Sequence, residues 1–336
     1  MSTFNLFERC TRELLNRLAE LGDETVEDDG ALLLREGMPS EQLFIVINGA
    51  LSAITESALA TREKLDTLER GALVGEMSWL EQRPAVASIE VRKRATLLAI
   101  PLDQLNECLK HDFEFAKQFY RMIAEKLALQ IKRQNILIHR FSHHSNSHDP
   151  LRKVLVLFAE LEEMDVHRLA GLGQRRRLSP EDVLFRENDP VTALHIVMGG
   201  EADITVSIAG EEHSVGSSRR GELLGEMTFL LPEQSCAAAT IQSRSELDLL
   251  EIDSSLLMKE LRLDHKLAVR FYRGIACMLS QRSRDQLLSR QLAELSRRAE
   301  GDLDQLTISQ LEGATRAARH FDWLCRHARR RQEFSQ

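Results

Sequence analysis

The chain has 336 residues, 43% of them hydrophobic and 29% charged, and its formal net charge is −8. These values are typical of a soluble globular protein long enough for two domains, and the acidic balance argues against a general nucleic-acid binder. Five scattered cysteines without a CxxC motif, an N-terminus without a signal pattern and the lack of a long apolar run argue against a disulfide framework, secretion and a membrane span. They predict a cytoplasmic protein.

The first half of the chain is predicted to contain a short helix, a strand-rich body and a longer helix. Leucines at helical spacing open it: Leu14, Leu15, Leu18 and Leu21. Segments rich in Leu, Ile and Val and separated by glycine then predict strands, for example at 31–35, 43–47 and 96–100. After Pro101, apolar residues mark one face of a long helix: Phe115, Phe119, Met122, Leu127, Ile131 and Ile138.

A polar segment at 141–150 follows, and its Ser, Asn, Asp and Pro content predicts a linker. Together with His139 it carries four histidines. Because no acidic or thiol group accompanies them at a fixed spacing, we favour a solvated linker over a metal site.

The second half repeats the first. A shift of 151 positions aligns residues 6–50 with 157–201 without a gap, and 15 of these 45 positions are identical. After small loop changes, Gly71–Met77 aligns with Gly221–Met227, and Phe119–Arg121 aligns with Phe271–Arg273. A period near 150 residues is too long for a solenoid and indicates a duplicated domain.

A glycine–glutamate pair stands between a predicted strand and a single helical turn in each copy. These pairs are Gly75-Glu76 and Gly225-Glu226. Backbone N–H groups at such a turn can hold a phosphate, and the glutamate can accept a hydrogen bond from a ribose hydroxyl. The segment resembles the phosphate-binding cassette of the cyclic nucleotide-binding domain family. The resemblance covers about 6–140 and 157–292.

The resemblance implies an α+β fold: two tandem, jelly-roll-like β-rolls, each flanked by N-terminal helices and a long C-terminal helix. It implies a cyclic nucleotide-binding-like domain at 1–140, the linker at 141–150, a second such domain at 151–292 and a helical extension at 293–336. It also implies candidate nucleotide-binding residues. In the first domain these are Gly75, Glu76, Met77, Ser78, Arg83, Ala85, Val86, Ala87, Ser88, Gln134 and Asn135, and in the second Gly225, Glu226, Met227, Thr228, Ala237, Ala238 and Thr240.

One departure from the family pattern bears on the ligand. The position of the family's phosphate-binding arginine is occupied by Ala85 in the first copy and by Ala237 in the second, and Arg83 lies two residues earlier. The loss of one partner of a buried ion pair costs about 3–5 kcal/mol, which weakens affinity for a cyclic monophosphate on the order of 10²–10⁴-fold. The cassettes therefore bind a nucleoside or a noncanonical cyclic mono- or dinucleotide, or Arg83 substitutes in the first site, or they bind nothing.

The chain after 290 is predicted to extend the second long helix, with a leucine seam suited to a homodimer, and to end in a further helix rich in arginine. This tail is too short for the DNA-binding domain of the family's transcription factors, so a solvated helix end or a protein-docking surface is favoured.

The sequence contains no catalytic, metal or cofactor motif, and we predict that the protein is not an enzyme. The leading prediction is a regulator that senses a nucleotide and relays its binding to a protein partner through helix movement. The alternatives are a ligand-independent scaffold for dimerisation and docking, and a DNA-binding regulator.

Overall fold

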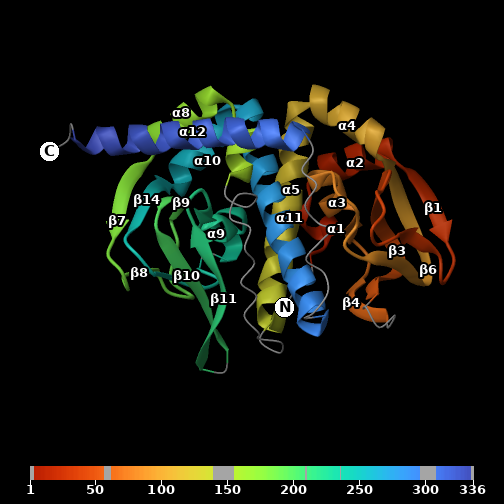
Figure 1. The fold of residues 1–336 in the computed structure, drawn as a ribbon. Helices are drawn as coiled ribbons and strands as arrows, with labels where there is room; N and C mark the ends of the chain where they lie inside the picture. Colours follow the sequence, from red (N-terminus) through yellow and green to blue (C-terminus); the bar gives the residue numbers. More distant parts are fainter. Residues whose placement is uncertain are drawn as a thin grey trace. The chain divides into compact units, whose positions relative to one another are not determined.

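The computed structural model describes residues 4–56, 62–138, 155–208, 210–234, 236–295 and 308–333. The chain divides into two compact units: Met1–Gln130 with Leu279–Gly301, and Ile131–Met278 with Asp302–Gln336. Each unit contains one β-roll (Figure 1). In the part of the chain that is described, no helix is long and apolar enough to cross a membrane. The predicted linker at 141–150 lies outside the described residues, and the predicted domain limits stay predictions.

The elements of unit 1 follow the predicted order of helix, strands and long helix. Thr11 begins the second helix, because its hydroxyl accepts a hydrogen bond from the backbone N–H of Leu14 at 3.2 Å. The elements are α1 Leu6–Arg9, α2 Arg12–Leu21, β1 Asp23–Glu27, β2 Leu32–Leu34, β3 Gln42–Glu56, β4 Arg62–Leu68, β5 Leu73–Val74, α3 Glu76–Glu81, β6 Ser88–Pro101, α4 Leu102–His111 and α5 Phe113–Ile138, whose residues from Ile131 belong to unit 2.

The sheet of unit 1 has the order β1-β6-β3-β4, with β2 also paired to β6 and β5 to β3. β3 and β6 are longer than the predicted strands at 43–47 and 96–100. The pairing continues through register shifts at Asn48 and Ala50, so one strand passes through irregular positions where the sequence pattern is interrupted. The core between the strands contains Val46, Leu51 and Leu97, none of which is exposed to solvent.

Unit 2 repeats this arrangement with two four-stranded sheets, β11-β10-β13-β8 and β12-β9-β14-β7. Val197, Leu247 and Leu249 fill the core between them. The elements are α7 Val156–Glu160, α8 Glu163–Leu172, β7 Gln174–Leu178, β8 Val183–Phe185, β9 Ala193–Gly199, β10 Glu201–Ile208, β11 Glu211–Arg219, β12 Leu223–Leu224, α9 Glu226–Leu230, η1 Pro232–Gln234, β13 Thr240–Ser243, β14 Leu247–Asp253, α10 Ser254–Leu263, α11 His265–Leu295, whose residues from Leu279 belong to unit 1, and α12 Ile308–Glu333. The predicted α+β fold with tandem β-rolls is confirmed.

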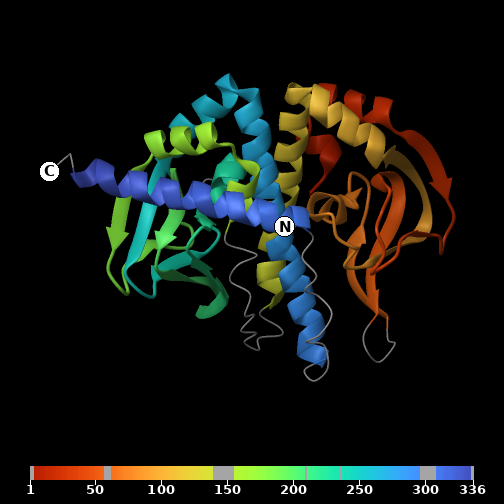
Figure 2. The ribbon, with the colours of Figure 1, turned by 45° about the horizontal axis from the view of Figure 1, so that its top comes forward.

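The C-terminal helix α12 lies across α7 and α8 of unit 2 (Figure 2). Phe321 is 1% exposed, and its ring contacts the ring of Phe158 at 5.0 Å between centroids. Arg316 donates to the carbonyl of Ala159 at 2.8 Å, and Arg331 donates to the carbonyl of Gly171 at 3.0 Å. These carbonyls lie at the ends of α7 and α8, where helices leave backbone acceptors unpaired. The prediction of a solvated helix end is therefore wrong for the apolar face of α12 and for Arg316 and Arg331, which contact unit 2, whereas Arg319, Arg326 and Arg330 are exposed.

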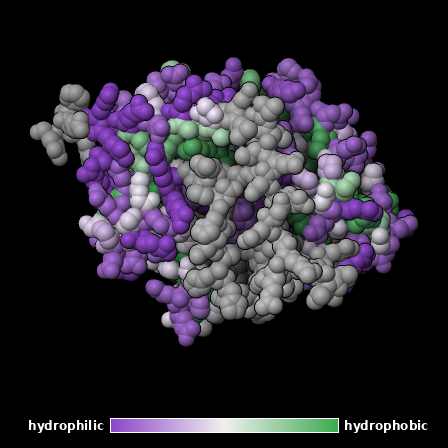
Figure 3. All heavy atoms as spheres, viewed as in Figure 1, coloured by the Kyte–Doolittle hydropathy of each residue, from purple (hydrophilic) through white to green (hydrophobic). Residues whose placement is uncertain are grey.

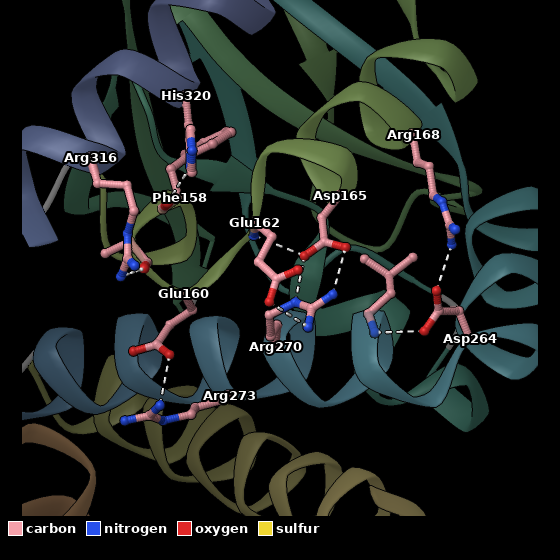
Figure 4. Close-up of polar contacts among 12 residues, drawn as sticks. Phe158, Glu160, Glu162, Asp165, Arg168, Asp264, Arg270, Arg273, Arg316 and His320 are labelled. Carbon is pink, nitrogen blue, oxygen red and sulfur yellow. Dashed lines mark hydrogen bonds and ion pairs between the residues drawn. The ribbon is translucent and has the colours of Figure 1, made fainter.

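Ion pairs join α7 and α8 to α10 and α11 in the same unit (Figure 4). Asp165 accepts two hydrogen bonds from the Arg270 guanidinium, at 2.5 and 2.9 Å. Arg273 pairs with Glu160 at 2.9 Å. A further pair, Arg168 with Asp264 at 2.7 Å, has a counterpart in unit 1, where Arg17 pairs with Asp112 at 3.1 Å.

The described surface in Figure 3 is mostly hydrophilic, with small separate groups of apolar side chains.

Candidate functional site

The two predicted cassettes share one backbone conformation. Gly75 precedes α3 with φ of 95°, and Gly225 precedes α9 with φ of 85°, both in the left-handed region. A Cβ atom at Gly75 would lie 3.1 Å from the carbonyl oxygen of Gln42, and one at Gly225 would lie 2.7 Å from that of Ala193. Glycine is required at both positions by conformation and by space. The predicted strand–glycine–helical turn is present in each copy.

The glutamate after each glycine is buried. Glu76 is 3% exposed and Glu226 is 4% exposed. Glu76 forms an ion pair with the ammonium of Lys126 on α5, whose side chain is 12% exposed. The residue of the second copy that aligns with Lys126 is Met278, which carries no charge. This particular ion pair is therefore confined to the first cassette.

The alanines at the arginine position are held by their backbones. Ala85 is 6% exposed; its N–H donates to the carbonyl of Met38 at 3.0 Å, and its carbonyl accepts from the N–H of Gly37 at 2.9 Å. Ala237 is bonded in the same way, to Asp189 at 2.8 Å and to Asn188 at 2.9 Å. Two backbone hydrogen bonds thus join each cassette to the turn that follows β2 or β8. The alanine at the arginine position supplies no charge.

Ser88 and Thr240 close the cassettes at their other end. The Ser88 hydroxyl accepts from the backbone N–H of Glu36 at 3.0 Å, and the Thr240 hydroxyl accepts from that of Glu187 at 2.9 Å. In this structure both hydroxyls serve the fold, and their part in ligand binding stays a prediction.

The remaining candidate residues differ in burial. Met77, Ser78, Ala87, Thr228 and Gln134 are buried, whereas Val86, Met227 and Ala238 are half-buried. Met77 belongs to unit 1 and Gln134 to unit 2. The side chain of Asn135 lies outside the described residues.

An aromatic contact between the cassette helix and the long helix explains part of the repeat. The Trp79 ring on α3 stacks on Tyr120 at 5.7 Å and meets Phe119 edge-on at 5.8 Å. In the second copy Phe229 meets Phe271 edge-on at 6.0 Å. The phenylalanine of the repeated Phe-Tyr pair thus packs against the cassette helix in both copies, and in the first copy the tyrosine does so as well. The repeat is visible in the aligned sequence, whereas this contact is not.

A second contact on the first cassette was not predicted from the sequence. Glu81, the last residue of α3, pairs with Arg284 on α11 at 2.7 Å and accepts a hydrogen bond from Ser280. Arg83 is 3.7 Å from the same carboxylate. Burial raises the pKa of Glu81 above its ordinary value and lowers the pKa of Arg284. The two residues are 203 positions apart, so no local pattern relates them.

No group of three residues able to hold a metal ion occurs in the described ranges. The linker histidines lie outside these ranges.

A family model, the cyclic nucleotide-binding domain, matches residues 28–112 and 175–264, just over half of the chain. The chain belongs to the cyclic nucleotide-binding domain family. Both matched segments contain a cassette described above.

The chain is also similar to regulatory proteins and kinases of cyclic-nucleotide signalling. It is 20% identical to a cAMP-dependent protein kinase regulatory subunit of Blastocladiella emersonii, over 72% of this chain and 52% of that protein. It is 22% identical to the cGMP-dependent protein kinase egl-4 of Caenorhabditis elegans, over 72% of this chain and 26% of that protein. The chain therefore spans about half or less of the length of these relatives.

Among solved structures, it is similar to the regulatory subunit of a cAMP-independent protein kinase A from Trypanosoma cruzi bound to guanosine. That match has 17% identity and a TM-score of 0.29, and it covers 76% of this chain and 80% of the other. Membership of the family supports a regulatory, sensory role for the tandem domains.

Proposed function

We propose that this protein is a non-enzymatic sensor whose first β-roll binds a nucleoside or a noncanonical cyclic nucleotide through Glu76 and relays this binding through α5. The carrying observation is the ion pair between Glu76 and Lys126. It joins the buried carboxylate of the cassette to the long helix that follows the roll. A ligand that takes over the carboxylate must therefore change the contacts of α5.

The missing charge at the arginine position sets the class of ligand. Ala85 and Ala237 are buried and hydrogen-bonded through their backbones, so a lone cyclic phosphate meets no guanidinium from either residue. The absent partner reduces affinity on the order of 10²–10⁴-fold relative to a complete cassette. This supports a nucleoside, a cyclic dinucleotide or another noncanonical cyclic nucleotide over cAMP and cGMP.

The relay follows from competition for one carboxylate. A ribose hydroxyl that donates to Glu76 displaces Lys126 or shares the carboxylate with it. The Lys126 side chain is largely buried, so its ammonium needs a new partner or must move toward solvent. Either change alters the position of α5, and a protein partner or a second copy bound to α5 would respond.

A thermal-shift screen tests the proposal with cAMP, cGMP, cyclic di-GMP and nucleosides as probes. A ligand at 100 times its Kd adds about 2.7 kcal/mol of stability. We expect a shift with a nucleoside or cyclic dinucleotide that is lost in Glu76→Gln and kept in the matched variant Glu226→Gln. A shift that depends on neither glutamate contradicts binding by the cassettes.

The Ala85→Arg variant tests whether only the charge is missing. If the cassette is otherwise complete, this change should create cAMP binding by the first site. Absence of cAMP binding in a folded Ala85→Arg variant counts against a ligand-competent cassette.

A ligand-independent scaffold is the second candidate, because Lys126 already neutralises Glu76 without a ligand. On this view the rolls present surfaces for a protein partner and for homodimerisation through the long helices. The absence of any thermal shift across the screen would favour it. DNA binding has less support, because the described residues after 307 form one helix that is docked on unit 2.

A further inference from the structure

We infer that Arg284 is a positioning residue for the first cassette: it holds the loop at 82–84 from both sides and so couples the end of α11 to the ligand-binding backbone. The inference rests on the proposed function only for its ligand-binding consequence. The coupling itself can be tested without a ligand.

The guanidinium of Arg284 spans the loop between α3 and Ala85. Its Nε atom donates to Glu81 Oε2 at 2.7 Å, where α3 ends. Its Nη1 atom donates to the carbonyl of Pro84 at 3.1 Å, directly before Ala85. Between these two contacts Gln82 adopts a left-handed conformation with φ of 50°. One side chain thus connects both ends of a loop whose backbone is unfavourable for a non-glycine residue.

The contact is buried, which makes it sensitive to the loss of either partner. The side chains of Glu81 and Arg284 are 1% and 7% exposed. Ser280 lies one helical turn before Arg284 and donates to the same carboxylate. The Nη2 atom of Arg284 is buried and has no hydrogen-bond partner within the described ranges. Burial of the Arg284 guanidinium carries a desolvation cost, and its contacts with Glu81 and Pro84 offset this cost.

The two residues that form the Glu81–Arg284 ion pair occur in the first copy and are replaced in the second. The residue of the second cassette that aligns with Glu81 is Leu231, which is 2% exposed, and the residue of the first long helix that aligns with Arg284 is Lys132. The second cassette therefore lacks this carboxylate and provides an internal control. α11 starts in the second repeat, at His265, but its residues from Leu279 belong to unit 1. Coupling is reciprocal: if α11 orders the cassette, a ligand on the cassette orders the end of α11.

Hydrogen exchange of the full chain without ligand tests the coupling. In Arg284→Met we expect amides of 76–85 to exchange on the order of 100-fold faster, because the buried carboxylate of Glu81 loses the guanidinium at 2.7 Å and keeps only the Ser280 hydroxyl and the more distant Arg83 at 3.7 Å. Amides of 226–237 should not change. Ser280→Ala keeps the ion pair and should give an effect of about 10-fold in the same segment. The double variant Glu81→Leu with Arg284→Met should recover most of the protection, because it replaces the buried pair by apolar side chains.

Unchanged exchange of 76–85 in Arg284→Met would overturn the inference, and so would equal acceleration in both cassettes. If Arg284→Met does not fold, the Ser280→Ala result decides in the same way.

Ligand affinity supplies a readout that a merely structural contact would not change. In the Ala85→Arg background with cAMP as the probe, adding Ser280→Ala should weaken binding by about 10-fold while the unfolding midpoint of unit 2 stays constant. Equal affinity in both variants contradicts a positioning role. If a folded Ala85→Arg variant does not bind cAMP, this counts against a ligand-competent first cassette, and the exchange experiment still decides the coupling.

Discussion

Replacement of Asp165 by leucine should destabilise unit 2 far more than the same change combined with Arg270→Gln. The Asp165 side chain is 3% exposed, and it accepts both hydrogen bonds from Arg270 described above (Figure 4). It also accepts from the backbone N–H of Glu162 at 2.9 Å, as part of the capping box of α8. The first copy has Leu14 and Gln118 at the two aligned positions, so the repeat itself provides the uncharged pair.

The expected loss of unfolding free energy follows from the burial of the ion pair. Removal of one member of a fully buried ion pair costs about 3–5 kcal/mol. The Arg270 side chain is 22% exposed and keeps a contact to Glu162 at 3.1 Å, so we take a value at or below the bottom of this range, about 2–3 kcal/mol. Loss of the helix cap adds about 1 kcal/mol. We expect about 3–4 kcal/mol for Asp165→Leu and about 1–2 kcal/mol for the double variant, since the buried charge has then been removed.

Urea unfolding followed by tryptophan fluorescence measures both values. The chain has two tryptophans, and Trp323 on α12 stacks on His167 of α8 at 3.7 Å. In a Trp79→Phe background, which copies Phe229 of the second cassette, the signal comes from Trp323 alone. The reasoning is refuted if Asp165→Leu costs under about 1 kcal/mol, or if the double variant is no more stable than the single one.

Two further predictions concern unit 2. Burial holds the pKa of His195 below its ordinary value of 6.5, although the ring is hydrogen-bonded to Glu251. The folded state therefore keeps the ring neutral. Stability is fully present above pH 6.5 and is lost as the pH falls from there toward the folded pKa, and His195→Phe, which copies Phe44, should remove this loss in unfolding experiments at pH 5 to 7. Phe321→Ala should cost about 3–5 kcal/mol and release α12, seen as faster hydrogen exchange at 314–331; unchanged exchange would contradict the docking.

Much of the fold was predictable because its signals are local. The segments rich in Leu, Ile and Val between glycines, the helical spacing of apolar residues and the duplication indicated the strands, the long helices and both cassettes. The lengths of β3 and β6 were underestimated, because their pairing continues through bulges beyond the apolar segments at 43–47 and 96–100. The role of α12 was misjudged for a related reason. Arg316 and Arg331 look solvated in sequence, but each donates to a backbone carbonyl of α7 or α8, which no sequence pattern displays.

The sequence by itself determined that one domain occurs twice and that neither cassette has an arginine at the phosphate position, since both facts depend only on aligned residue types. The tertiary structure decided which charges the cassettes do meet. Lys126 reaches Glu76 across 50 positions, and Arg284 reaches Glu81 across 203. Such pairs depend on how the helices pack against a β-roll. The sequence shows which residues are charged, but it does not show which of them become partners when both are buried.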